Sequence, residues 1–105
     1  MSGEALEIGP LKLDAEQREL RLDGVVIELT KVEFDILAML ALRKDKAVSR
    51  SQLVERVLDE EKEGGERTLD VHVSRIRKKL GEAGKHLETV WGIGYRLTSE
   101  PKEKK

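Results

Sequence analysis

The sequence predicts an α+β fold, in which a small antiparallel sheet is followed by three helices and a C-terminal β-hairpin. Three observations lead to this prediction. Apolar and polar residues alternate over the first thirty residues, which is the period of strands. From Thr30 to Leu80 the apolar spacing is mostly helical. Two short strand-like runs follow Gly84.

The expected N-terminal sheet consists of four short alternating runs. Turn signals separate them at Gly9-Pro10, at residues 14–16 and at Asp23-Gly24. Asp-Gly suits a type I′ hairpin because both central residues of that turn need a positive φ. The alternating residues give the sheet one apolar face; they are Leu6, Ile8, Leu11, Leu13, Leu20, Leu22, Val25, Ile27 and Leu29.

Each of the first two expected helices begins with a capping box. Thr30 with Glu33 starts a helix that runs to about residue 43, and Ser49 with Gln52 starts the second. Residues 59–65 have no apolar face and are predicted to form a loop. The third helix is expected over residues 66–80, and Gly81 ends it. Its buried stripe has the spacing i, i+4, i+7 and i+11, and comprises Leu69, Val73, Ile76 and Leu80.

The C-terminal hairpin is expected over residues 87–97, with a turn at residues 92–94. His86, in a polar stretch just before it, is expected to be solvated. The predicted elements together divide the chain into an N-terminal tail (1–4), one domain (5–98) and a disordered polar tail (99–105).

Composition excludes several classes of function. The 105 residues include no Cys and only two His, so disulfides, thiolate metal sites and a protein-built haem or zinc site are not expected, and we predict no metal or cofactor. The longest apolar run, residues 36–42, is too short to span a bilayer. There is no basic segment typical of a signal peptide, so we expect a cytoplasmic protein that does not bind membranes.

Catalysis is not expected either. Asp70, His72 and Ser74 are the residue types of a catalytic triad, but their spacing in the sequence does not allow the geometry of one. On a helix, Asp70 and Ser74 share a face from which His72 points away, so the three side chains cannot act as a relay. We predict that the protein is not an enzyme.

Charge is segregated along the chain. Residues 1–66 hold 10 Lys and Arg against 16 Asp and Glu, whereas residues 67–96 hold 7 against 3. On a helical projection, an acid-free basic arc lies opposite the buried stripe of the third helix, with Arg75 near its middle and Asp70 on the flank shared with Arg77. The other residues of this arc are Arg67, Thr68, Val71, His72, Lys78 and Lys79. A helix with one buried edge and one basic edge can lie in the major groove of DNA.

Five blocks of sequence carry a family resemblance: residues 29–34 (LTKVEF), 48–50 (VSR), 67–73 (RTLDVHV), 75–80 (RIRKKL) and 89–96 (TVWGIGYR). In this order they resemble the winged-helix effector domain of OmpR/PhoB-type response regulators, over about residues 5–97. The resemblance implies a winged helix-turn-helix with an N-terminal four-stranded antiparallel sheet, three helices and a C-terminal β-hairpin wing. It also implies sequence-specific binding of double-stranded promoter DNA, usually at tandem direct repeats, as the output domain of a two-component system.

The resemblance also implies roles for individual residues. Arg75 and Val71 would meet base edges in the major groove, where Arg is the best reader of guanine and an apolar side chain can contact a thymine methyl. The wing, residues 87–97, would lie on the DNA backbone or in the minor groove. The residues expected on the backbone are Arg67, Thr68, His72 and Arg77 in the helix, and Thr89, Gly92 and Tyr95 in the wing. Lys78, Lys79, Trp91 and Arg50 are expected close to DNA.

Two departures from the family pattern concern the wing and the connector. Family members often carry Arg where this chain has Trp91, which either packs under the wing or stacks on a sugar edge. In some members of the family the connector before the third helix touches RNA polymerase. The connector of this chain is acidic, which suits such a partner surface and not a DNA surface, so the resemblance implies that it faces RNA polymerase. The connector residues are Asp59, Glu60, Glu61, Lys62 and Glu63.

The predicted partners follow from the same resemblance. A receiver domain is expected as a partner, and nothing in this chain could form one. The chain is therefore either the effector domain of a two-domain protein or a stand-alone relative. The isolated chain is expected to be a monomer. The alternative function is a winged-helix module that binds protein without binding DNA, since one fold can host several functions.

Overall fold

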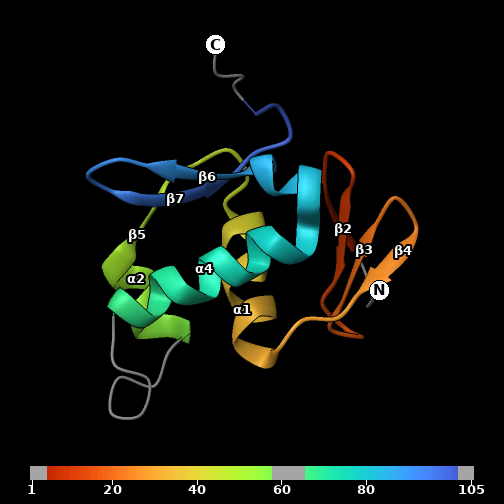
Figure 1. The fold of residues 1–105 in the computed structure, drawn as a ribbon, viewed down its shortest axis with the longest axis horizontal. Coiled ribbons are helices and arrows are strands. Elements are labelled where there is room, and N and C mark those ends of the chain that lie inside the picture. Colours follow the sequence, from red (N-terminus) through yellow and green to blue (C-terminus); the bar gives the residue numbers. More distant parts are fainter. Residues whose placement is uncertain (1–4, 58–65, 102–105) are drawn as a thin grey trace.

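The four-stranded sheet predicted at the N-terminus is present. In the computed structural model, residues 5–57 and 66–101 are described, apart from the side chains of Glu66 and Arg67. The strands β1 (Ala5–Ile8), β2 (Leu11–Asp14), β3 (Glu19–Leu22) and β4 (Val25–Ile27) lie in that order and pair antiparallel (Figure 1). Asp23 and Gly24 both have a positive φ, as the predicted turn requires.

The register of the sheet explains its apolar face. Leu6, Leu13, Leu20 and Ile27 are aligned across the four strands, and so are Ile8, Leu11, Leu22 and Val25. Residues two apart on one strand point to the same side, so the two rows share one face. The middle of this face is buried, whereas Val25 on the edge strand is 63% exposed.

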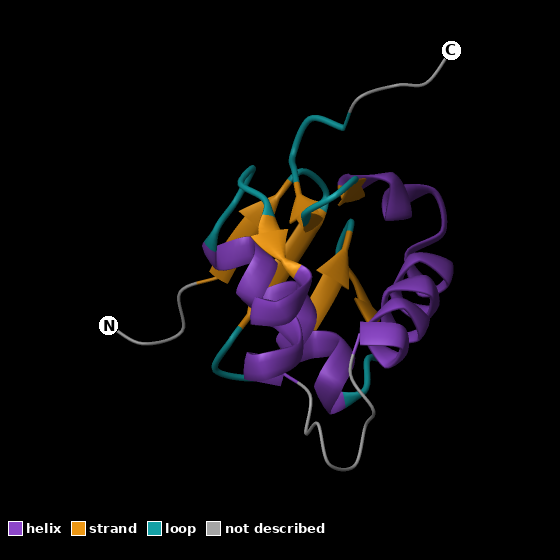
Figure 2. Ribbon diagram, turned by 90° about the vertical axis from the view of Figure 1, so that its left-hand side faces the viewer, coloured by secondary structure: helices purple, strands orange, loops and turns teal. Residues whose placement is uncertain are grey.

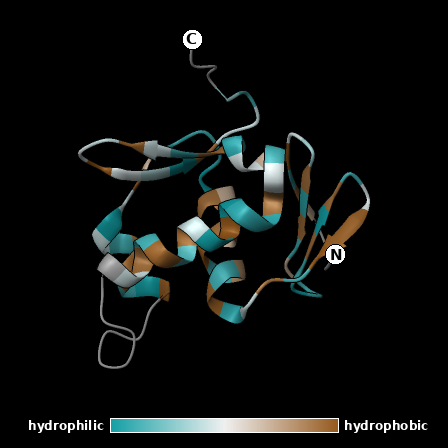
Figure 3. Cartoon of the chain, in the orientation of Figure 1, coloured by the Kyte–Doolittle hydropathy of each residue, from teal (hydrophilic) through white to brown (hydrophobic). Residues whose placement is uncertain are grey.

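Three described helices pack against one another, and the first of them also packs against β1 of this sheet. They are α1 (Lys31–Leu42), α2 (Arg50–Val57) and α4 (Glu66–Leu80). Figure 2 shows the strands lying above and between the helices, and Figure 3 shows hydrophobic and hydrophilic residues alternating along α4. All four predicted stripe residues of α4 are buried, together with Phe34, Ile36, Leu37 and Leu40 of α1.

Both capping boxes are confirmed. The Thr30 hydroxyl oxygen accepts from the Glu33 amide at 3.2 Å, and Glu33 Oε1 accepts from the Thr30 amide at 3.0 Å. At α2, the Ser49 hydroxyl accepts from the Gln52 amide at 3.1 Å, while the Ser49 amide donates to Gln52 Oε1 at 3.4 Å. These bonds satisfy amides that have no partner inside a helix.

The C-terminal hairpin belongs to a second sheet, which the sequence did not predict in full. Strands β6 (Leu87–Val90) and β7 (Gly94–Leu97) form the hairpin, and a two-residue strand, β5 (Val48–Ser49), pairs with β7. The predicted turn at residues 92–94 therefore needs correction, because Gly94 is a strand residue opposite Ser49. A Cβ on Gly94 would collide with the carbonyl oxygen of Val48 and lie 2.9 Å from the Arg50 amide nitrogen.

The expectation of a solvated His86 is wrong. His86 ends a 3-10 helix, η1 (Gly81–His86), and is only 6% exposed. Its Nδ1 lies 2.7 Å from the carbonyl oxygen of Thr98, and the backbone of Gly9, in the turn between β1 and β2, lies against its ring. The polar neighbours of His86 in the sequence predicted exposure to solvent, but a turn that is distant in the sequence covers the imidazole.

Candidate nucleic-acid interface

The candidate interface is the side of α4 turned away from the core. Val71, Ser74, Arg75 and Lys78 are exposed there, opposite the buried stripe, and we call these four residues the solvent face of α4. Val71 is 43% exposed and is the apolar member of this face. Because no acid belongs to this face, it combines positive charge with one apolar contact point.

Lys79, which the projection placed on the basic arc, has a structural partner. Its Nζ lies 2.6 Å from Oε1 of Glu33, a carboxylate only 1% exposed at the start of α1. Burial alone would raise the pKa of Glu33, but the hydrogen bonds from Lys79 and the Thr30 amide outweigh it and hold the pKa below its ordinary value. Lys79 thus compensates a buried charge, which sets it apart from Arg75 and Lys78.

His72 does not present its ring nitrogens to solvent. Both are shielded, and the imidazole lies close enough to Glu33 to affect the pKa of that carboxylate. The helical projection placed His72 on the basic arc but could not show that its side chain turns toward α1. The phosphate contact expected for His72 stays a prediction.

Asp70 links three elements on one flank of α4. Its Oδ2 lies 2.7 Å from Nη2 of Arg50 at the start of α2, and its Oδ1 accepts from the Tyr95 hydroxyl of β7 at 2.6 Å. The hydrogen bond from Arg50 is the main cause that lowers the pKa of Asp70, so the carboxylate stays ionised. Burial and Asp70 together raise the pKa of Tyr95, so its hydroxyl remains a donor.

Arg77 makes a second link from α4 to the wing. Its guanidinium donates to the carbonyl oxygen of Leu87 at 3.0 and 2.7 Å and to the hydroxyl of Thr89 at 2.9 Å. Arg77 and Thr89, both predicted on the DNA backbone, thus bind each other. Tyr95, another predicted backbone contact, is 5% exposed and belongs to the core.

The tip of the wing is apolar and exposed. Trp91 is 86% exposed and Ile93 is 50% exposed, so Trp91 does not pack under the wing. Gly92 has a φ of 83°, and a Cβ placed on it would meet no heavy atom within 4 Å. A hollow of about 350 Å³ lies between this tip and the residues Arg50, Asp70 and Tyr95.

Other predicted residues are placed as follows. Thr68 is half-buried in the first turns of α4, and Arg50 faces Asp70. The side chain of Arg67 and the acidic residues 59–63 lie outside the described residues. The roles of Asp70 and Tyr95 in joining α4 to the wing were missed, although an acid within an otherwise basic helical segment was a signal in the sequence.

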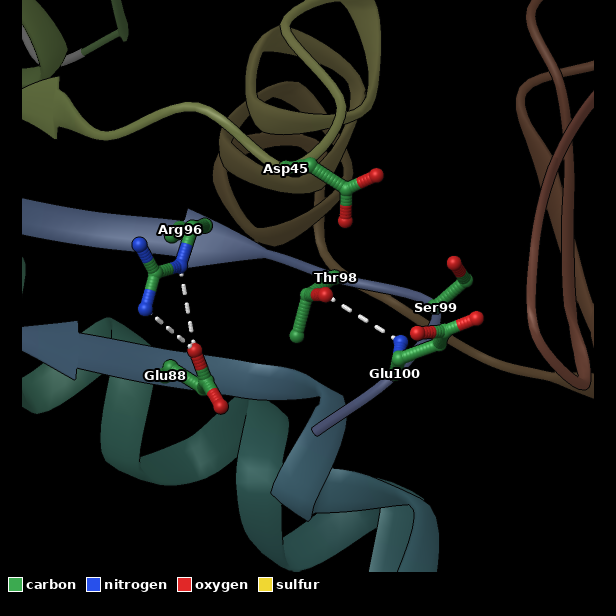
Figure 4. Close-up of a pocket in the computed structure, with 6 residues that line it drawn as sticks. All are labelled: Asp45, Glu88, Arg96, Thr98, Ser99 and Glu100. Atoms are coloured by element: carbon green, nitrogen blue, oxygen red, sulfur yellow. Dashed lines mark hydrogen bonds and ion pairs between the residues drawn. The ribbon is translucent and has the colours of Figure 1, made fainter. Parts of the chain in front are cut away.

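A second hollow lies at the base of the hairpin and has the wrong charge for phosphate. Its lining residues are Asp45, Glu88, Arg96, Thr98, Ser99 and Glu100 (Figure 4). The guanidinium of Arg96 is paired with Glu88 at 2.7 Å, which leaves Asp45 and Glu100 to set the local charge. We therefore restrict the candidate interface to the solvent face of α4 and the wing.

Comparison of sequences identifies related proteins. The family described as "Transcriptional regulatory protein, C terminal" matches residues 24–97. The sensory transduction protein RegX3 of Mycobacterium leprae is 41% identical over 103 residues, which cover 94% of this chain and 52% of that protein. PrrA of Mycobacterium tuberculosis, a transcriptional regulatory protein, is 40% identical over 98 residues (91% and 42%). The chain thus spans about half the length of the curated relatives it matches.

Solved structures show the same fold. The C-terminal effector domain of BfmR from Acinetobacter baumannii superimposes with a TM-score of 0.80 at 32% identity, covering 99% of this chain and 98% of that one. The RstA DNA-binding domain of Klebsiella pneumoniae, solved in complex with the RstA box, gives 0.79 at 28% identity (92% and 99%). The AdeR DNA-binding domain, in complex with an intercistronic region, gives 0.75 at 29% identity (89% and 98%).

Proposed function

The chain belongs to the family of C-terminal domains of transcriptional regulatory proteins, and on that premise we propose that it binds specific sequences in duplex DNA. It would do so as the output domain of an OmpR/PhoB-type response regulator. Two similar domains, RstA and AdeR, were solved bound to DNA, which supports the proposal. The function that we propose for this domain is therefore the regulation of transcription.

The observation that carries the proposal is the solvent face of α4. Arg75 and Lys78 lie on it, Val71 lies one helical turn before Arg75, and the stripe on the opposite side of the helix is buried. This is the arrangement that a helix needs in a major groove, since one edge must rest on the domain while the other meets bases. We assign base contacts to Arg75 and Val71.

The contacts that position the domain would surround this face. We assign phosphate contacts to Lys78, Thr68 and Arg67, because phosphate contacts fix register without reading sequence. Gly92 would allow the wing backbone to approach a phosphate closely, since it has no Cβ. Trp91, which is exposed at the tip, would lie against the sugar edges.

We also propose the partners that this function implies. The isolated domain would be a monomer that binds tandem direct repeats more tightly than a single site. A receiver domain would control it, and the acidic connector at residues 59–63 would face RNA polymerase. The function implies a cytoplasmic protein. Separately, no helix among the described residues is long and apolar enough to cross a bilayer.

Selection from random duplexes tests the proposal directly. We expect a single enriched sequence, and an affinity that falls linearly with salt on logarithmic axes as counterions are released. Tandem copies of the enriched site should bind more tightly than one copy. Failure to enrich any sequence, at low as well as physiological salt, would contradict DNA recognition and favour the protein-binding alternative.

A further inference from the structure

We propose that Asp70 is a positioning residue, which fixes the wing against α4 so that helix and wing meet DNA as one rigid unit. This inference rests on the proposed function and deepens it. Asp70 need not touch DNA for this role. It would act through Tyr95 and Arg50, which hold the neighbouring elements.

The first step concerns the attachment of the wing to α2. The Arg50 amide donates to the carbonyl oxygen of Ile93 at 3.1 Å, and β5 pairs with β7 just before α2 begins. The wing and the start of α2 therefore move together. What remains to be fixed is the position of this unit relative to α4.

Asp70 fixes that position at the outer end of the hairpin. One carboxylate oxygen binds Arg50 and the other binds Tyr95, so a single side chain of α4 holds both parts of the unit. Hydrogen bonds that involve an ionised group are shorter and stronger than neutral ones, and both of these are within 2.7 Å.

Arg77 fixes the inner end of the same hairpin. It lies seven residues after Asp70, which places both on one flank of α4, and it binds Leu87 and Thr89 of β6. The guanidinium carbons of Arg50 and Arg77 lie 5.9 and 5.7 Å from the centre of the Tyr95 ring. The hairpin is thus held at two points, and Asp70 is the one nearer the exposed tip.

The charge of Asp70 gives the inference a sharp test. An acid on a helix that approaches phosphates repels them, so simple electrostatics predicts tighter DNA binding when Asp70 is removed. Loss of a positioning residue predicts weaker binding to the preferred duplex, because the wing no longer sits where its contacts require. The two effects have opposite signs.

Three variants separate these effects. Asp70→Ala removes both bonds from a solvent-exposed helix position, and Tyr95→Phe removes one bond while keeping the buried ring. Glu88→Gln is the matched control, because it removes an acid that pairs with Arg96 of the same hairpin. Amide residual dipolar couplings of residues 89–94 relative to α4, measured without DNA, report the orientation of the wing.

We expect Asp70→Ala and Tyr95→Phe to change the orientation of residues 89–94, and Glu88→Gln to leave it as in the wild type. Affinity for the duplex enriched by selection should fall about tenfold in Asp70→Ala, the loss that goes with one hydrogen bond to a charged group. Affinity for random duplex should change by less than about threefold, because non-specific binding depends mainly on electrostatic attraction to the phosphates. A purely structural role of Asp70 would lower thermal stability without changing the ratio of the affinities for the preferred and the random duplex.

Two results would overturn the inference. One is an unchanged wing orientation in both variants; the other is a preferred duplex bound by Asp70→Ala as tightly as by the wild type or more tightly. If the wild-type domain binds no duplex at all, the proposed function fails. The dipolar couplings still decide in that case whether Asp70 holds the wing.

Discussion

Replacing Lys79 with Ala should destabilise the domain without removing a DNA contact. The substitution leaves the carboxylate of Glu33, which is 1% exposed, without the ammonium group 2.6 Å away. A buried charge that loses its partner keeps its desolvation cost and loses the compensating attraction. The amide of Thr30 remains as a donor to the same oxygen, at 3.0 Å.

The size of the effect follows from the exposure of the two partners. Breaking a fully buried ion pair from one side costs about 3–5 kcal/mol, whereas an exposed pair contributes about 0–1 kcal/mol. The Lys79 side chain is 36% exposed, so water can replace part of its interaction. We therefore expect a loss of about 1–3 kcal/mol in the free energy of unfolding, or about 4–8 °C in Tm for each kcal/mol.

The loss should depend on pH in a defined direction. In the wild type the pKa of Glu33 is below its ordinary value of 4.5, so its stabilising contribution is present above pH 4.5 and disappears as the pH falls through the lower folded-state pKa. Without Lys79, burial raises the pKa of Glu33, and protonation relieves the penalty as the pH falls. The difference in stability between the two proteins should therefore shrink on acidification.

Thermal unfolding followed by circular dichroism at pH 7 and at pH 4 measures both effects. Lys78→Ala is the matched control, because Lys78 is the adjacent lysine and lies on the solvent face of α4. Its Tm should stay within the small range typical of surface substitutions. A Tm for Lys79→Ala within about 2 °C of the Lys78→Ala value at pH 7 would refute the assignment of Lys79 to the buried pair.

Other consequences concern recognition and the wing. Arg75→Ala should lower the binding free energy for the preferred duplex by about 1–3 kcal/mol and relax the preference at one base pair. Arg67→Ala should lower the affinity for all duplexes equally and reduce the slope of log affinity against log salt by roughly one unit. Titrations of both variants over a salt series separate these effects. Equal losses on specific and random duplex in Arg75→Ala would mean a phosphate contact. Gly94→Ala should cost about 3 kcal/mol in chemical denaturation, because its Cβ meets the backbone of Val48; an unchanged midpoint would contradict this packing. Changing the acids among residues 59–63 to Ser should leave DNA affinity unchanged or slightly higher while transcription in vitro falls, and a large loss of DNA affinity would count against a polymerase-facing role.

Elements defined by local patterns were predictable from the sequence. The capping boxes at Thr30 and Ser49 and the turn at Asp23-Gly24 formed as expected, because each depends on groups within three residues of one another. The buried stripe of α4 was equally clear, since helical geometry fixes which positions share a face. Order and spacing of the sequence blocks then indicated the family.

Features that depend on distant parts of the chain were not predictable in the same way. Strand β5 is two residues long and exists through its pairing with β7, so no periodicity could reveal it. His86 is buried by a turn that lies far away in sequence. In both cases a contact between residues far apart in the sequence decides the structure, and the neighbouring residues in the sequence do not indicate it.

The sequence by itself determined that one side of residues 66–80 is apolar and the other basic, because the periodicity of a helix follows from its geometry. Only the tertiary structure decided what each charged group on that helix does. Lys79 and His72 turn toward α1 and its buried Glu33, and Asp70 and Arg77 bind the wing, while Arg75 and Lys78 face solvent. The physical reason is that a helical projection gives the direction in which a side chain leaves the helix, whereas its partner is set by whichever element the fold brings within hydrogen-bonding distance.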